Sequence, residues 1–412
     1  MIRRNAIGIL RPNCGSREEK AGKFMAQELA FALINPYTIS KSRTGGVIGR
    51  LMSRTGLELA AARMFGPSQE LVTRYADSLL TSNQTEPEFA RLLSEYVRKN
   101  YAPDAATGRR RRVILLMFEG ENAIQKVREA TGHLRAGWVG GETIRDTYGD
   151  YVEDEAGKVT YFEPAVLVAP SVERAASVLR LWAEYSETDG GIMDQSMDVS
   201  DSEGVQSTLV LIKPDNFRFP SVRPGHIIDL LSRSGLRIVG LRKIAMTVSQ
   251  AEDFYGPVRP ILHEKFKQIT AQRAGDILEK ALNIEIPENA KAVIGEQVGP
   301  IVGERQFEEI VKFMTGHRPS EVAEADKAKT GSENCLALIY KGMSAVEKIR
   351  YLLGPTDPAK AQVGSVRREY GSDIMVNAAH ASDSPENAAR EMLIVGVQND
   401  SIREWVEKYY GA

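Results

Sequence analysis

The sequence predicts an α+β protein built as two tandem domains, each with an antiparallel sheet in the ferredoxin-like order βαββαβ. Three observations support this prediction. Related segments recur along the chain, a polar segment separates the two copies, and strand-like and helix-like patterns alternate within the second copy. Each copy has close to the usual length of one domain.

The internal repeat is visible as segments that align without gaps. The aligned pairs are 46–63 (GVIGRLMSRTGLELAAAR) with 225–242 (GHIIDLLSRSGLRIVGLR), 119–132 with 341–354, and 143–149 with 365–371. The last two pairs share one offset, which chance similarity would not maintain. The repeat therefore predicts two related domains.

A polar segment marks the boundary between the copies. Residues 187–204 are rich in Asp, Ser and Gly and poor in apolar residues, which is typical of a solvated linker. We therefore expect a first domain at 1–190, a linker at 191–205 and a second domain at 206–412.

The elements of the second copy follow from its periodicity and its turn residues. In chain order we expect a strand at 207–212, a helix from Pro224 to Gly235, a strand at 236–246, a short helix capped by Ser249 and Gln250, a long helical stretch, a strand at 335–340, a helix at 343–354, a short strand near 374–376, and a helix from Ser384 to about Val395. This order predicts the ferredoxin-like sheet.

The composition is that of a globular protein with a large core: 412 residues, 42% of them apolar and 26% charged, with a net charge of −2. Because Lys and Arg nearly balance Asp and Glu, we expect no nucleic-acid partner, and the run Arg109–Arg112 is interpreted as a solvated strand end. No apolar stretch approaches the roughly 20 residues that span a bilayer, so no membrane partner is expected.

The cysteines and the first residues bear on the compartment. Cys14 and Cys335 are too few for a disulfide framework, which favours a reducing compartment, the cytoplasm. The apolar run within residues 1–10 is too short for a secretory signal and is interpreted as a terminal arm.

The common phosphate-loop and metal motifs are absent from the sequence. There is no GxxxxGK[ST] and no GxGxxG after a strand, and the five histidines are scattered without HExxH spacing. We therefore expect no metal held directly by the protein.

Three segments of the second copy resemble the signature segments of nucleoside diphosphate kinases. They are LIKPD at 211–215, GPTDPAKA at 354–361 and NAAHASDSPENAARE at 377–391. The resemblance covers nearly all of the second copy apart from insertions, and most of the first copy in weakened form. It implies transfer of the γ-phosphate of a nucleoside triphosphate to a nucleoside diphosphate by a ping-pong mechanism, with Mg²⁺ arriving on the nucleotide phosphates.

The resemblance also implies roles for the residues around one histidine. His380 matches the family's phosphorylated histidine, because imidazole can both accept and release a phosphoryl group near neutral pH. Glu391 matches the acid that orients the ring, and Ser382 supports it. Asp383 would contact metal-bound water, and both Ser382 and Asp383 could also help to cap the following helix.

Further matches would bind the nucleotide. Lys213, Arg350, Arg367 and Thr356 would meet the phosphates, and Lys213 would belong to the catalytic residues. Lys213 and Asn377 would also hold the sugar hydroxyls. Tyr255 would line the histidine pocket, and Phe307 would lie beside the base. Without the flanking motifs, the two arginines would be interpreted as solvated surface charge.

An insertion near 257–305 separates Tyr255 from Phe307, where the family runs almost directly from one to the other. Gln306 occupies the usual aromatic position, with Phe307 beside it, and Phe266 within the insertion could substitute for it. Two interpretations of the insertion stay open: a packed helical excursion, or a lid over the nucleotide.

The first copy has lost the reactive groups. Its alignment puts Asn35 opposite Lys213, Pro164 opposite Asn377, Leu167 opposite His380, and Ala169-Pro170 opposite Ser382-Asp383, while Arg128 and Arg145 persist opposite Arg350 and Arg367. We therefore expect transfer in the second copy only.

An alternative to the enzyme is a nucleotide-binding pseudokinase or scaffold that works through its insertions. The resemblance further implies a homo-oligomer, with three two-domain chains mimicking a hexamer.

Overall fold

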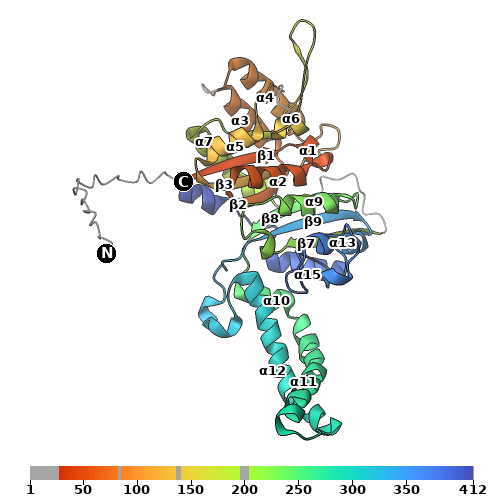
Figure 1. Cartoon of the computed structure of the whole chain (residues 1–412). Helices are drawn as coiled ribbons and strands as arrows, with labels where there is room; N and C mark the ends of the chain where they lie inside the picture. Colours follow the sequence, from red (N-terminus) through yellow and green to blue (C-terminus); the bar gives the residue numbers. More distant parts are fainter. Residues whose placement is uncertain (1–26, 82–84, 136–140, 195–203, 412) are drawn as a thin grey trace, which may run out of the picture.

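The computed structural model describes residues 27–81, 85–135, 141–194 and 204–411 (Figure 1). The expected terminal arm at 1–10, Cys14, and 195–203 of the expected linker lie outside the described residues. All the helices and strands discussed below fall within these ranges.

The first half contains the elements β1 Gln27–Ile34, α1 Pro36–Ser40, α2 Thr44–Thr55, β2 Glu58–Phe65, α3 Gln69–Leu80, α4 Pro87–Asn100, β3 Val113–Glu121, α5 Ala123–Thr131, α6 Ile144–Tyr148, β4 Asp150–Glu153, β5 Val159–Glu163, β6 Val166–Val168, α7 Val172–Glu184 and α8 Ser186–Asp189.

The second half contains β7 Val205–Ile212, η2 Pro214–Asn216, α9 Arg223–Ser232, β8 Arg237–Ile244, α10 Val248–Tyr255, α11 Val258–Leu282, α12 Glu288–Thr315, η3 Pro319–Glu321, η4 Glu324–Asp326, β9 Cys335–Met343, α13 Ala345–Leu353, η5 Pro358–Lys360, α14 Val366–Tyr370, β10 Ala379–Ala381, α15 Pro385–Val395 and α16 Arg403–Tyr410.

Eight strands form one antiparallel sheet in the order β10-β7-β9-β8-β2-β3-β1-β6. Each half supplies four strands in the ferredoxin-like arrangement, which confirms the predicted fold class. The halves meet edge to edge where Arg63 of β2 pairs with Arg242 of β8. These residues end the aligned segments 46–63 and 225–242, so the repeats pair through equivalent positions.

The helices α2 and α9, which begin the same aligned segments, pack against each other across the junction. Their backbones approach closely at glycines, since a Cβ atom on Gly225 would lie 2.5 Å from the backbone nitrogen of Gly49. Glycines on both helices thus permit the close helix contact that accompanies the continuous sheet.

The insertion forms a helical hairpin of α11 and α12 that projects away from the sheet (Figure 1). The helices touch along one row of small residues, where side chains on Gly295, Gly299 or Gly303 would collide with the backbone of α11. The C-terminal part of α12 enters the core through Phe307 and Met314 among others, and Leu262 near the start of α11 packs against it.

Two sequence-based element predictions were wrong. The last strand lies at 379–381 rather than near 374–376, because the Asp373 carboxylate accepts hydrogen bonds from the backbone N–H groups of Met375 and Val376 and holds them in a turn. The short helix begins with a capping box of Thr247 and Gln250, so the expected cap at Gln250 is confirmed and the one at Ser249 is wrong.

The domain boundaries stay a prediction. The last helix of the second half nevertheless packs on the first half, on the other side of the boundary proposed near 190–205. Helix α16 packs against α7 of the first half, and the Tyr410 hydroxyl donates to the Leu29 carbonyl. In the described part of the chain, every helix is too short or too polar to cross a bilayer.

Candidate active site

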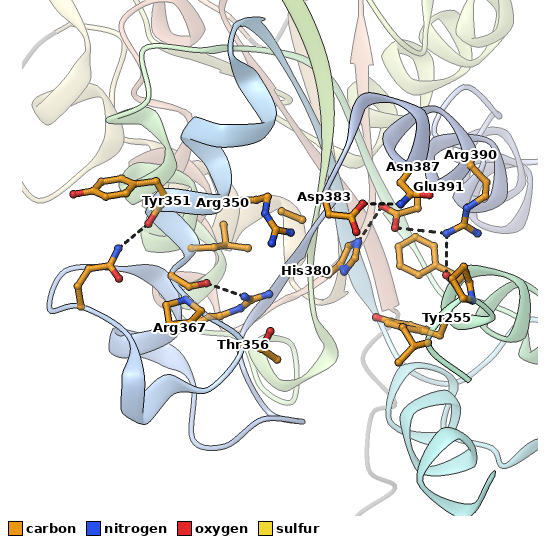
Figure 2. A pocket seen from close by; sticks show the side chains of 18 residues that line it. Tyr255, Arg350, Tyr351, Thr356, Arg367, His380, Asp383, Asn387, Arg390 and Glu391 are labelled. Atoms are coloured by element: carbon orange, nitrogen blue, oxygen red, sulfur yellow. Dashed lines mark hydrogen bonds and ion pairs between the residues drawn. The ribbon is translucent and has the colours of Figure 1, made fainter. Parts of the chain in front are cut away.

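A cavity of about 840 Å³ opens in the second half, between α10, α13, β10 and α15 (Figure 2). His380 lies on β10, where it pairs with Leu211 of β7, and Glu391 projects from α15 toward it. Arg350 comes from α13, Thr356 from the loop after it, and Arg367 from α14. The topology therefore gathers residues far apart in the sequence around one histidine.

The imidazole of His380 is held at one nitrogen. Its Nε2 lies 3.0 Å from Glu391 Oε2, and the buried Ser382 hydroxyl donates to the same oxygen at 2.6 Å. The ring of Phe254 packs edge-on against the imidazole at 4.9 Å between centroids. His380 Nδ1 has no hydrogen-bond partner within the described residues, and the side chain is 24% exposed to the cavity side.

Two arginines give the cavity its positive charge. Arg350 is exposed and its side chain forms no hydrogen bond or ion pair with the described residues, so its guanidinium group is available to a ligand. Arg367 is fixed by bonds to the Gly354 carbonyl at 2.8 Å and the Ala379 carbonyl at 3.1 Å. Burial, together with the charge of Arg350, lowers the pKa of Arg367 to about 10.

Asp383 supplies a carboxylate at the cavity edge. It accepts a hydrogen bond from the Asn387 amide at 2.6 Å, which holds the pKa of Asp383 below its ordinary value, with help from the charges of Arg350 and His380. Ser384, rather than Ser382 or Asp383, caps α15 by accepting from Asn387 N. The described residues contain no group of three or more His, Cys, Asp or Glu arranged to hold a metal.

Lys213 and Asn377 lie behind the cavity wall rather than in it. Lys213 is 7% exposed, and its Nζ donates to the Met375 carbonyl at 2.6 Å and to Asn377 Oδ1 at 2.9 Å. The Asn377 amide in turn donates to the carbonyl of Thr356, which lines the cavity. Burial lowers the pKa of Lys213 to about 8, against the opposing charge of Asp215.

Phe307 does not reach the cavity, in contrast to its expected role beside the base. Its side chain is 1% exposed within the core, with the Arg259 guanidinium 4.9 Å from the ring centroid. Tyr255, Pro257 and Val258 form the wall on this side. The Tyr255 hydroxyl is buried without a hydrogen-bond partner among the described residues, and burial raises the pKa of Tyr255.

Comparison with known proteins assigns this arrangement to a family. A family model described as nucleoside diphosphate kinase matches residues 28–158 and 302–399, more than half of the chain. The chain belongs to the nucleoside diphosphate kinase family. The split match also reflects the tandem form, since one region falls in each half.

Individual members of the nucleoside diphosphate kinase family match about half of this chain. The nucleoside diphosphate kinase of Pyrobaculum aerophilum is 31% identical over 198 residues, 46% of this chain and 93% of that protein. That of Staphylothermus marinus is 28% identical over 200 residues, 48% of this chain and 98% of that protein. A solved NDP kinase structure from P. aerophilum is 28% identical, with a TM-score of 0.31, and covers 46% of this chain and 94% of that one.

Several residues of the cavity had not been expected there from the sequence. They are Phe254, Tyr351, Asn387 and Arg390. A signal existed for two of them, because Asp383, Asn387 and Arg390 follow one another at helical spacing within the signature segment and share a face with Glu391. Phe254 and Tyr351 carry no comparable pattern.

The first half has a corresponding cavity of about 750 Å³. Leu167 pairs with Leu33 on β1 as His380 pairs with Leu211 on β7, so the strand register places Leu167 at the position of the histidine. The Arg128 guanidinium, unlike that of Arg350, is used on the Pro170 carbonyl at 3.0 Å.

Arg145 preserves the arrangement of Arg367. It donates to the carbonyls of Gly132, Pro164 and Val166, whereas Arg367 donates to those of Gly354 and Ala379. The arginine at this position donates to backbone carbonyls in the same way in both repeats, so in both it holds the end of the fold together.

Proposed function

We propose that the second half transfers the γ-phosphate of a nucleoside triphosphate to a nucleoside diphosphate by a ping-pong mechanism, with His380 as the phosphate carrier. The observation that carries the proposal is the asymmetry of its imidazole. Nε2 is bonded to Glu391, while Nδ1 is unbonded in the cavity that the free guanidinium of Arg350 also lines. Membership of the nucleoside diphosphate kinase family supports the same activity.

In the first half-reaction, the lone pair on Nδ1 would attack the γ-phosphorus. The N–P bond would form as the P–O bond to the leaving nucleoside diphosphate breaks, and the leaving oxygen would keep the electron pair. Glu391 would accept a hydrogen bond from the Nε2–H group, which keeps its proton, and would stabilise the positive charge that develops on the ring. In the second half-reaction an oxygen of another nucleoside diphosphate would take the phosphoryl group.

The cavity residues suit a triphosphate. Arg350 and the Thr356 hydroxyl would bind phosphate oxygens, and Arg367 would contribute positive charge from its fixed position. The Lys213–Asn377 pair, adjoining the wall at Thr356, would bind the sugar hydroxyls after a small side-chain movement. The unpartnered Tyr255 hydroxyl is a further donor on the opposite wall.

Magnesium fits this donor set as a partner of the nucleotide rather than of the protein. When bound to the phosphates, Mg²⁺ would neutralise part of their negative charge. Asp383, an ionised carboxylate beside His380, would accept hydrogen bonds from its water ligands.

The test is phosphoenzyme formation with radiolabelled ATP and magnesium. We expect an acid-labile, base-stable label on the unaltered chain, and parallel initial-rate lines for two nucleotide substrates. His380→Gln abolishes both label and transfer, whereas the exposed His226→Gln keeps them. Label retained on His380→Gln would sink the mechanism, and an unlabelled wild-type chain would favour a nucleotide-binding scaffold.

We also propose that three chains associate, giving six repeat units. The support is the pairing of two repeats within one chain through a continuous sheet. A mass in solution of about three times 45.5 kDa is expected. Sedimentation equilibrium measures it, and a single-chain mass would contradict it.

A further inference from the structure

A second cavity, of about 260 Å³, lies at the junction of the two halves. We call it the seam cavity. The first half contributes the end of α1, the turn after it, Thr44 at the start of α2, and Arg112 just before β3. The second half contributes the end of α9, Arg237 at the start of β8, and Tyr340 of β9. None of its lining residues belongs to the cavity around His380.

Two buried hydroxyl groups of the seam cavity have no partner. Tyr340 and Thr44 are each 1% exposed, and within the described residues neither side-chain oxygen forms a hydrogen bond. Such groups are rare in folded proteins, because an unsatisfied buried hydroxyl loses its bonds to water without replacement. Both residues line the same cavity, and an occupant could satisfy both once a small shift of each side chain turns its buried oxygen toward the cavity.

The charges around the seam cavity are also uncompensated. Arg112 donates one N–H to the Ile238 carbonyl across the junction, and Arg237 is exposed; neither forms an ion pair within the described residues. The lining contains two arginines but neither Asp nor Glu. Burial, and then the nearby charge of Arg237, lower the pKa of Arg112 to about 10.

One carboxylate lies close by. The charge of Asp229 on α9 contributes, after burial, to raising the pKa of Tyr340. Asp229 is itself half-buried with its own pKa raised by burial, and it does not line the cavity. Asp229 forms no ion pair with Arg112 or Arg237 within the described residues, so both arginines lack a counter-charge.

We propose that the seam cavity binds a small oxyanion of the phosphate class, held jointly by Arg112 and Arg237 and by the hydroxyls of Tyr340 and Thr44. Guanidinium groups match the oxygens of such an anion in both charge and geometry, and its remaining oxygens accept from hydroxyl donors. The volume exceeds the roughly 30 Å³ share of one water several-fold.

The anion would contact one arginine from each half. It would therefore bind the joined form in preference to a separated or unfolded form, and its binding free energy would stabilise the junction. This inference does not depend on the reaction proposed for His380, because the two cavities share no residue.

The experiment is a titration of the full chain with inorganic phosphate, followed by thermal unfolding and by calorimetry at constant ionic strength with chloride as the reference anion. We expect phosphate to raise Tm above the value in chloride. Arg237→Gln and Tyr340→Phe should each weaken the affinity for phosphate about tenfold, the usual effect of losing one charged or buried hydrogen bond. Thr44→Val should act in the same direction.

Matched variants separate the seam cavity from general effects. Arg233→Gln removes a nearby arginine that bonds to Gly364 and does not line the cavity. Thr208→Val removes another buried, unpartnered hydroxyl, which also lies outside it. Both should keep the full phosphate response.

Two results would overturn the proposal. Phosphate could raise Tm no more than chloride does, which would mean that water alone occupies the cavity. Alternatively, the seam variants and the matched variants could respond equally, which would place the phosphate elsewhere. Because Arg237 is exposed, its variant stays interpretable even if Tyr340→Phe weakens folding.

Discussion

One carboxylate oxygen, Oε2 of Glu391, accepts from both the His380 ring and the Ser382 hydroxyl. Glu391→Gln keeps the shape but removes the negative charge that supports the ring, so we expect kcat to fall about 10- to 100-fold with KM little changed. The control is Glu386→Gln, an exposed acid in the first turn of the same helix. Steady-state kinetics decide the matter, and equal rates in both variants would contradict the role of Glu391.

Lys213 predicts a pH dependence of stability. Its folded pKa, about 8, lies below the ordinary value of 10.5. Between these values the unfolded chain holds the proton that the folded chain has lost, so this group's contribution to stability rises with pH; below about pH 8 the full penalty for burying the charge is present. Lys213→Met removes the titration.

The measurement is urea unfolding of the wild type and Lys213→Met at pH 7 and pH 9.5. From the lower to the higher pH, the free energy of unfolding of the wild type should rise relative to the variant by about 2 kcal/mol. A difference that stays constant with pH would mean that the lysine is held in an ordinary charged state.

At the scale of elements, the α11–α12 hairpin can be shortened without disturbing the site. The backbones of Lys267 and Gly295 touch, because a Cβ atom on Gly295 would lie 2.5 Å from the Lys267 carbonyl oxygen. A short glycine-rich turn can therefore replace residues 268–294. We expect nucleotide KM to stay within about twofold, since only Pro257 and Val258 of the insertion line the cavity. A KM several-fold higher, measured by initial rates, would support the lid interpretation.

The elements also show how far the sequence could predict this structure. The gapless repeats and the signature around His380 were sufficient for the fold and for the cluster of His380, Glu391 and Ser382. The burial of Phe307 was not predictable, because an aromatic residue at helical spacing suits either a core or a base platform, and only the packing of α12 decides between them.

The inward position of Lys213 could not be predicted from the sequence either. It depends on acceptors at Met375 and Asn377, which the chain brings to β7 only through the long loop that precedes β10. The same loop contains the Asp373 turn that displaced the predicted strand.

At the scale of the molecule, the two halves are alike in backbone and unlike in chemistry. Ala165 and Ala378 share a positive φ before the equivalent strands β6 and β10, yet Leu167 stands where His380 does. We therefore expect at most one phosphate per chain after treatment with ATP. Intact-mass measurement checks this, and a second stable phosphohistidine would show that the first half is active.

The first half is completed by α16, which is the last helix of the chain to be synthesised. Its Tyr410 hydroxyl bonds to Leu29, 381 positions earlier in the chain, and its Ile402 and Val406 are buried in the shared core. Between the end of α7 at Glu184 and the start of α16 at Arg403, a ribosome working at about 5 to 20 residues per second needs roughly 10 to 45 seconds. During that interval the surface of α7 that α16 later covers lacks this partner, so the packing of the first half is completed only when the last helix has been made.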